Sequence, residues 1–138
     1  MDACVAAWPS LADEQARSLE VFKDFPAPKL GYENITKKYS DAAGVRRELE
    51  AVKAVWPSLK ERSAGQVYSF EKMQALFKLA GAPYEPEHIG ITRADIRDMF
   101  PIVQLMRWRY NVLDLAKRAR LYDNLAASPF APGGAWEI

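Results

Sequence analysis

Helix-start signals recur along this chain and constrain it to a helical fold. In three places a Ser, Thr or Asn is followed three residues later by Asp: "SLAD" from Ser10, "TRAD" from Thr92 and "NVLD" from Asn111. In such a capping box the first side chain accepts a hydrogen bond from a free backbone amide, and the carboxylate reaches back to the first amide. Asp41 and Ser69 precede two further periodic segments and can act as single caps. We therefore expect a helix to begin beside each of these five residues.

Apolar side chains follow these starts at helical spacing, and no run alternates long enough to form a strand. The stripes contain Val45, Leu49, Val52 and Trp56, then Phe70, Met73, Leu76 and Phe77, then Ile96, Met99, Phe100, Val103 and Met106. The pattern predicts helices over about residues 11–23, 32–39, 42–56, 70–80, 93–106 and 112–122. The expected fold is an all-α bundle of about five to seven helices with Pro-bent connections.

Prolines and glycines set the expected interruptions. Pro57 removes a donor and clashes one turn back, so it predicts a kink or a break in its helix. Pro101 should bend the next long helix unless that helix ends there, and Gly81 is a natural left-handed stop. Pro and Gly punctuate the last residues without any period. We expect a single helical domain over residues 1–125 and an irregular tail over 126–138.

Charge and composition limit the kinds of partner. The chain of 138 residues has 19 basic and 18 acidic residues, for a net charge of +1. A nearly neutral chain has no overall field to recruit nucleic acid or an anionic membrane. With Cys4 as its single cysteine it has no internal disulfide, and no apolar run is long enough to span a bilayer. The N-terminus also lacks the basic residues of a signal peptide. We therefore expect a soluble, cytoplasmic protein.

The segment "AGAPYEPEHIGITRADI" holds the only histidine, His88, beside Glu85 and Glu87. A zinc or iron site needs three or four converging ligands, which neighbours in one loop do not supply by themselves. The alternative is a Pro-stiffened connector with a loop histidine, and this interpretation is the stronger one. Phosphate-binding glycine motifs and a nucleophile-elbow serine are also missing. The sequence thus predicts no catalytic, cofactor-binding or metal-binding residue.

A basic and aromatic cluster lies near the C-terminal end. It contains Arg107, Trp108, Arg109, Tyr110, Lys117, Arg118 and Arg120. Such interleaving can bind phosphates or nucleic acid, but the near-neutral chain favours a solvated helix face instead. Arg109, Tyr110 and Asp114 remain the most plausible polar residues for a structural or substrate-side role.

Two motifs at a fixed separation carry a family resemblance. "AGAPYEPEHIGITRADIRDMF" followed by "RWRYNVLDLA" resembles the C-terminal helical region of sn-glycerol-1-phosphate dehydrogenases, in the iron-dependent alcohol dehydrogenase and dehydroquinate synthase-like superfamily. The likeness extends over roughly residues 8–125. The chain departs from the family at His88, where an acid is more usual, and at Asn111, which replaces a threonine.

The resemblance implies a parent reaction whose machinery lies elsewhere. The family reduces dihydroxyacetone phosphate with NAD or NADP as cofactor and a divalent metal. Its glycine-rich nucleotide domain and its Asp and two His metal ligands have no counterpart in this sequence. The resemblance therefore implies a noncatalytic C-terminal helical domain whose partner is a missing N-terminal nucleotide-binding half or a second copy of the chain.

Three alternatives stay open. A separately supplied partner segment would restore the dehydrogenase activity. A free-standing helical module would instead bind another protein through the surface that once faced the missing half. Phosphate or nucleic-acid binding through Arg107, Arg109 and Arg118 is the weakest of the three.

Overall fold

The computed structural model describes all 138 residues and is helical throughout, with eight α-helices, no strand and 66% of residues in helices. The predicted all-α class is confirmed. The α-helices are α1 (Asp2–Ala6), α2 (Leu11–Val21), α3 (Leu30–Lys38), α4 (Ala42–Ala64), α5 (Phe70–Leu79), α6 (Arg93–Leu105), α7 (Val112–Arg118) and α8 (Tyr122–Ala127), with 3-10 turns η1 (Pro86–Ile89) and η2 (Ser128–Phe130). Two helices beyond the six predicted segments, α1 and α8, are short and begin without a side-chain cap, so no capping signal in the sequence marks their start.

The predicted caps are all formed. Ser10, Thr92 and Asn111 each accept a hydrogen bond from the backbone amide three residues later, and the Asp there accepts one from the cap amide. Asp41 accepts from the amide of Gly44, and Ser69 accepts from the amide of Lys72. These local bonds satisfy amides that a helix start leaves free, which is why the starts were readable from sequence.

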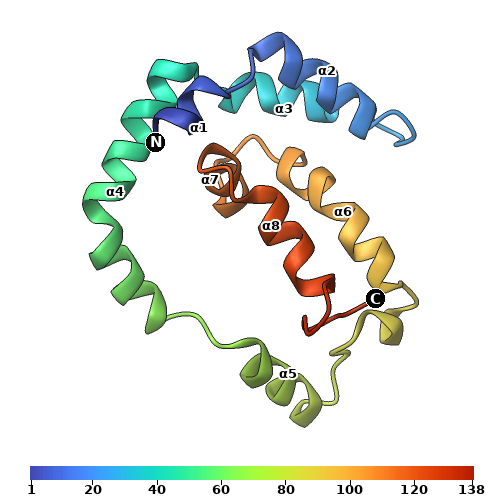
Figure 1. Ribbon diagram of the computed structural model, residues 1–138. Coiled ribbons are helices and arrows are strands. Elements are labelled where there is room, and N and C mark those ends of the chain that lie inside the picture. Colours follow the sequence, from blue (N-terminus) through green and yellow to red (C-terminus); the bar gives the residue numbers. More distant parts are fainter.

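Two helices of this fold continue through an internal proline. The possible break at Pro57 does not occur, because α4 continues through it to Ala64, and Figure 1 shows α4 as one long curved helix. α6 likewise runs through Pro101 to Leu105. Curvature relieves the clash of the ring with the preceding turn, at the loss of one hydrogen bond.

Two helices end earlier than their apolar pattern predicts. α2 stops at Val21, and α7 stops at Arg118 rather than near Tyr122. Arg120 has a left-handed backbone with φ of 58°, which terminates α7. Gly81 takes the predicted left-handed conformation, with φ of 68°.

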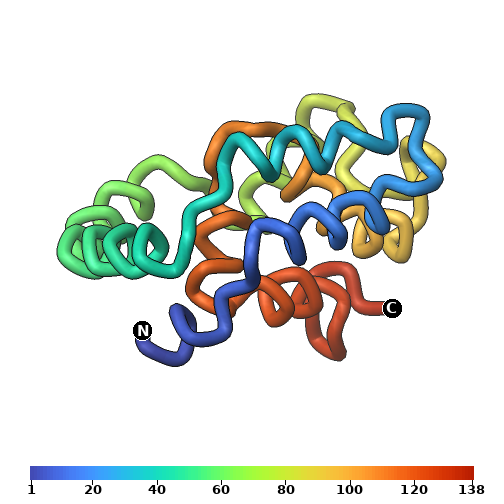
Figure 2. Tube along the Cα trace, turned by 90° about the horizontal axis from the view of Figure 1, so that it is seen from above, coloured from blue at the N-terminus to red at the C-terminus, as the bar shows by residue number.

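The helices form an open ring around α7 and α8 (Figure 1). α2 pairs with α3, and both pack on α6, while α4 makes its main contact with the short α1. From above, α4 lies at one end of the molecule and α6 at the other (Figure 2). The ring therefore has one tightly packed side, formed by α2, α3 and α6, and one loosely attached arc, formed by α4 and α5.

The hydrophobic core is small and lies on the packed side. Phe22, Ile35 and Leu105 are buried together, with Val21 and Ile102 packed against them. Only 15 of the 138 residues are buried. Val45 at the start of α4 is among them, but the rest of the α4 stripe and the whole α5 stripe are not. None of the helices combines the length and apolar character needed to cross a bilayer.

The C-terminal tail folds back onto the ring. Beyond η2 it has no regular helix, and α8 runs to Ala127, just past the predicted domain end. The indole of Trp136 meets the ring of Phe70 edge to face at 5.8 Å and lies 6.2 Å from that of Phe130. These aromatic contacts tie α5 to the end of the chain.

Candidate functional site

Asp114 lies in a buried position at the start of α7. Its Oδ1 accepts a hydrogen bond from Gln104 Nε2 at 2.6 Å and lies 2.8 Å from the ammonium of Lys38. Its Oδ2 accepts from the backbone amide of Asn111 at 2.9 Å, as the capping box requires. One carboxylate thus serves as a helix cap, a hydrogen-bond acceptor and an ion-pair partner.

The neighbouring residues Tyr110 and Arg109 have side chains in different surroundings. The Arg118 guanidinium lies over the Tyr110 ring at 4.5 Å from its centroid, and burial raises the pKa of the Tyr110 hydroxyl. Arg109 is exposed, and its guanidinium lies over the ring of its neighbour Trp108. The structure therefore places Tyr110 near the charges around Asp114 and leaves Arg109 on the surface.

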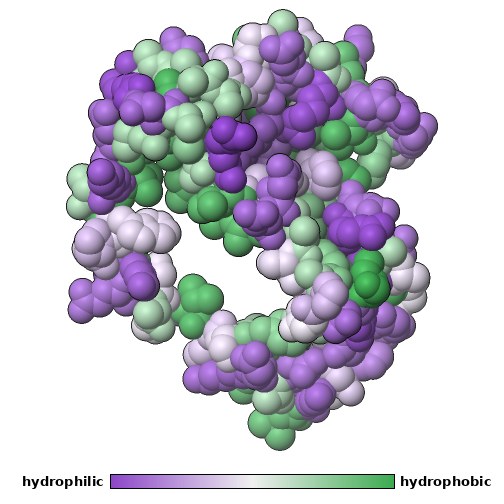
Figure 3. All heavy atoms as spheres, viewed as in Figure 1, coloured by the Kyte–Doolittle hydropathy of each residue, from purple (hydrophilic) through white to green (hydrophobic).

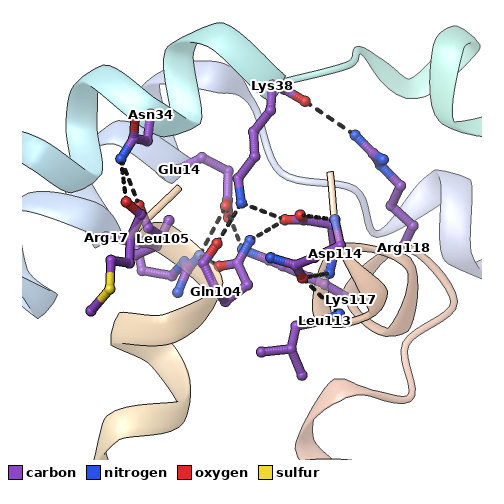
Figure 4. Close-up of polar contacts among 12 residues, drawn as sticks. Glu14, Arg17, Asn34, Lys38, Gln104, Leu105, Leu113, Asp114, Lys117 and Arg118 are labelled. Atoms are coloured by element: carbon purple, nitrogen blue, oxygen red, sulfur yellow. Dashed lines mark hydrogen bonds and ion pairs between the residues drawn. The ribbon is translucent and has the colours of Figure 1, made fainter. Parts of the chain in front are cut away.

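A network of charged and polar side chains surrounds Asp114, and we call it the buried ion cluster. Its members are Glu14, Lys38, Gln104, Asp114 and Lys117, from α2, α3, α6 and α7 (Figure 4). The Lys117 ammonium contacts the Glu14 carboxylate, and Lys38 donates to the backbone carbonyl of Gln104.

Two arginines border the cluster on opposite sides. Arg17 Nη2 donates to Gln104 Oε1 at 2.8 Å and to Glu14 Oε2 at 3.2 Å. Arg118 donates to the Lys38 carbonyl at 3.2 Å, and its Nη1 lies 2.8 Å from the Glu48 carboxylate. Because partners come from four helices, the cluster fixes how α2, α3, α6 and α7 sit against one another.

The energetics of the cluster are set by desolvation. Removing a charge from water costs several kcal/mol, and the loss is offset only when the charge is paired and hydrogen-bonded. Burial, reinforced by the positive charge of Arg17, lowers the pKa of Lys117 to about 8, against the opposing pull of Glu14. Lys117 therefore loses its proton at a lower pH than an exposed lysine does.

His88 does not meet other metal-ligand side chains. It lies in η1, where its ring contacts the Tyr84 ring edge to face at 4.5 Å and its Nδ1 accepts from the Tyr84 amide at 3.4 Å. Glu85 and Glu87 both pair with Arg93 instead. No three His, Cys, Asp or Glu side chains lie together as metal ligands would.

An apolar groove separates α4 from α7 and α8, and we call it the inner groove. It has a volume of about 450 Å³. It is lined by Leu49, Val52, Lys53, Trp56, Pro57, Val112, Leu115, Ala116, Ala119, Leu121 and Leu125. Figure 3 shows hydrophobic side chains along the rim of the hollow that the ring encloses. The predicted stripe of α4 therefore faces an open groove, and Trp56 is 50% exposed.

The stripe of α5 is also uncovered. Phe70, Met73, Leu76 and Phe77 lie on one face as the spacing predicts, yet each is 36–41% exposed. A second groove of about 340 Å³ lies between three of these side chains (Phe70, Met73 and Phe77), η1 and Trp136. Together, α4 and α5 present apolar faces of the kind that a globular protein normally buries.

Sequence reasoning missed most of the buried ion cluster. Glu14 lies one and two turns before the buried Ser18 and Phe22, and Lys38 lies one turn after the buried Asn34. A charged residue in register with a buried helix stripe is the signal that was available. Gln104, beside the buried Leu105, gives the same signal in α6.

No protein-family model, curated protein or solved structure matches the chain. The resemblance to the glycerol-1-phosphate dehydrogenases therefore depends only on the two sequence motifs that suggested it.

Proposed function

We propose that this chain is a noncatalytic helical domain that acts as one part of a larger dehydrogenase-like protein. The observation that carries the proposal is the inner groove, whose lining is apolar except for Lys53. The sequence resemblance supplies the identity of the whole: an NAD(P)-dependent enzyme that reduces dihydroxyacetone phosphate.

The inner groove is energetically unfavourable while it faces water. Burial of apolar surface contributes roughly 25 cal/mol per Å², so covering a continuous groove yields several kcal/mol. Val112 and Leu125 are 71% and 47% exposed on its α7 and α8 side. Soluble proteins rarely leave patches of this kind open unless another surface binds there.

The occupant we assign to the groove is the N-terminal portion of the dehydrogenase-like polypeptide. The groove is lined by α4 on one side and by α7 and α8 on the other, and Lys53 is its one charged residue. Such a lining suits the apolar face of another helix better than a charged or polar ligand. In that assembly the present domain supports the wall of the active-site cleft and the packing between subunits.

The buried ion cluster supports a structural rather than a catalytic role for the domain itself. Asp114 and Glu14 are each held by neighbouring cations, and Asp114 also caps α7. A general acid or base needs a hydrogen-bonding position open to substrate, whereas these two residues are 5% and 3% exposed.

The test is reconstitution with the N-terminal half of a glycerol-1-phosphate dehydrogenase, expressed separately. We expect the two chains to coelute in gel filtration, and the amides of α4 and α7 to gain protection from hydrogen exchange. Leu125→Glu should abolish this complex. Leu79→Glu, at a residue that is 86% exposed and outside the groove, is the matched control and should leave it intact.

Other outcomes would replace the proposal. Oxidation of NADH by the isolated chain with dihydroxyacetone phosphate would show that it is itself an enzyme. A stable dimer that Leu125→Glu dissociates would assign the groove to a second copy. A monomer that does not bind the N-terminal half would favour the free-standing module that binds another protein.

A further inference from the structure

A third cavity, polar rather than apolar, borders the buried ion cluster at Gln104 and Lys117. It has a volume of about 300 Å³ and lies between α1, the segment that follows α1, and residues of α2, α6, α7 and α8. We call it the cationic pocket. Its charged and hydrogen-bonding lining is formed by Arg17, Gln104, Lys117, Arg120, Tyr122 and Asp123, and Trp8 and Pro9 form an apolar side. It shares no lining residue with the inner groove.

Positive charge dominates the cationic pocket. Three cations, Arg17, Lys117 and Arg120, line it against the single carboxylate of Asp123. Glu14 neutralises part of this charge from behind, through its contacts with Lys117 and Arg17. Asp114 also faces Lys117 and is itself paired with Lys38. With this pair included, four cations meet three carboxylates and leave an excess of one positive charge. In a partly desolvated place that charge attracts an anion more strongly than it would in water.

Two donors at the pocket have no partner. Arg17 Nε and the Tyr122 hydroxyl are both shielded from solvent without a hydrogen bond. A buried polar group that lacks a partner costs free energy, so nearly all such groups in folded proteins are satisfied. Arg17 lines the pocket, and its side chain as a whole is 32% exposed. A ligand that draws Arg17 and Tyr122 toward itself would satisfy both donors.

The backbone at Arg120 is held in an uncommon conformation. Its φ of 58° is left-handed, a position usually taken by Gly at the end of a helix. The Arg120 amide donates to the Lys117 carbonyl at 3.0 Å, and the Leu121 amide donates to the Ala116 carbonyl at 2.8 Å. Gly would make the same turn with less strain but would place no guanidinium at the pocket.

We propose that the cationic pocket binds a small oxyanion, either free phosphate or the phosphate group of a small organic molecule. Arg17, Lys117 and Arg120 supply the charge, and the Tyr122 hydroxyl donates a hydrogen bond. Guanidinium groups match the geometry of phosphate oxygens, since they present paired donors in one plane. Trp8 gives an organic body an apolar surface to lie against. The site is independent of the inner groove and of the proposed dehydrogenase assembly.

The experiment uses the full chain with inorganic phosphate and with phenyl phosphate as probes. Isothermal titration calorimetry measures affinity, and thermal unfolding in phosphate is compared with sodium chloride at equal ionic strength. We expect phosphate to raise the midpoint of unfolding above that in chloride. Tighter binding of phenyl phosphate would assign the site to a phosphorylated organic molecule, and tighter binding of inorganic phosphate would assign it to the free ion.

Variants locate the site without depending on unfolding. Arg120→Gly should weaken phosphate binding about tenfold, because a charge-assisted contact is lost, while the free chain becomes no less stable. Tyr122→Phe should weaken binding by a smaller factor, and Asp123→Asn should strengthen it. Arg109→Gln removes the same charge from an exposed residue outside the pocket and should leave affinity unchanged.

Two results would overturn the proposal. One is the absence of binding heat together with equal midpoints in phosphate and chloride. The other is an equal loss of affinity in Arg109→Gln and Arg120→Gly, which would show that phosphate responds to overall charge rather than to this pocket.

Discussion

The ammonium of Lys38 lies 2.8 Å from Oδ1 of Asp114, and the two side chains are only 4% and 5% exposed. This contact joins the end of α3 to the start of α7, two elements distant in the chain. Because Asp114 also completes the capping box of α7, the same carboxylate fixes both where α7 begins and where it lies. The buried ion cluster is thus a structural joint of the packed side of the ring.

Removing Asp114 should destabilise the chain strongly. Asp114→Ala leaves Lys38 charged and unpaired in a buried place, which typically costs about 3–5 kcal/mol of unfolding free energy. Asp114→Asn keeps a capping side chain and should cost less. Urea unfolding followed by circular dichroism measures both.

The control is Asp98→Ala, which removes an exposed ion pair with Arg97 and should cost at most about 0.5 kcal/mol. Equal losses at Asp98 and Asp114 would contradict a structural role for the cluster.

Stability should rise with pH where Lys117 titrates. Burial lowers the pKa of Lys117 from 10.5 to about 8, so between these values the unfolded chain binds more protons than the folded one. The unfolding free energy therefore increases with pH over this window, by about 1–2 kcal/mol between pH 8 and pH 9.5. The groups that face Lys117 are Arg17, Glu14 and Asp114.

The range is chosen to avoid an opposing effect. Burial raises the pKa of the Tyr110 and Tyr122 hydroxyls above the ordinary value of 10.0, so above that pH their titration lowers stability. Urea midpoints at intervals from pH 8 to pH 9.5 give the measurement. Lys117→Met should remove the rise, and a wild-type slope that survives this substitution would assign the effect to another group.

Gly31 is fixed by the close approach of α2 and α3. A Cβ at this position would lie 2.8 Å from Phe22 Cδ2, in a ring that is 2% exposed and has no room to retreat. Overpacking of this kind costs about 1–3 kcal/mol, whereas Ala gains only about 1 kcal/mol over Gly in a helix. Gly31→Ala should therefore lower the unfolding free energy by about 1–2 kcal/mol.

The matched substitution is Gly65→Ala. There the nearest atom to a new Cβ is the Arg62 carbonyl oxygen at 3.7 Å, and the backbone is in the ordinary right-handed region. This variant should be as stable as the wild type or more stable by about 0.5 kcal/mol. A loss at Gly65 similar to the loss at Gly31 would argue against close packing as the cause.

The apolar stripe of α5 should contribute little to the stability of the isolated chain. Leu76 is 41% exposed, so Leu76→Gln should change the unfolding free energy by about 1 kcal/mol or less. Phe22→Ala, in the core, should cost about 3–5 kcal/mol. Chemical denaturation compares the two. A large loss at Leu76 would mean that α5 is packed in solution against a surface that the isolated fold does not provide.

Local signals predicted much of this fold because they act over a few residues. The boxes at Ser10, Thr92 and Asn111 each use two side chains within one turn, so their geometry follows from spacing alone. Pro57 shows the limit of such reasoning. Its effect depends on whether a helix can bend in space, and the exposed α4 has room to curve.

The candidate sites were much less accessible from sequence. Asp114 was recognised as a cap and a polar candidate, but its partners Lys38 and Gln104 come from other helices. Arg109 was a candidate beside Tyr110 and Asp114, and the structure leaves it on the surface. Spacing along the chain carries no information about which helix faces which.

The sequence by itself determined the helical class and the places where most helices begin, because capping and apolar periodicity are properties of neighbouring residues. Only the tertiary structure decided which stripes are buried. The stripe around Phe22 enters the core between α2, α3 and α6. The equally regular stripe of α5 remains exposed, and that of α4 is buried at Val45 but exposed at Trp56. The difference arises because burial needs a second surface, and a helix pattern specifies a face without specifying what will cover it.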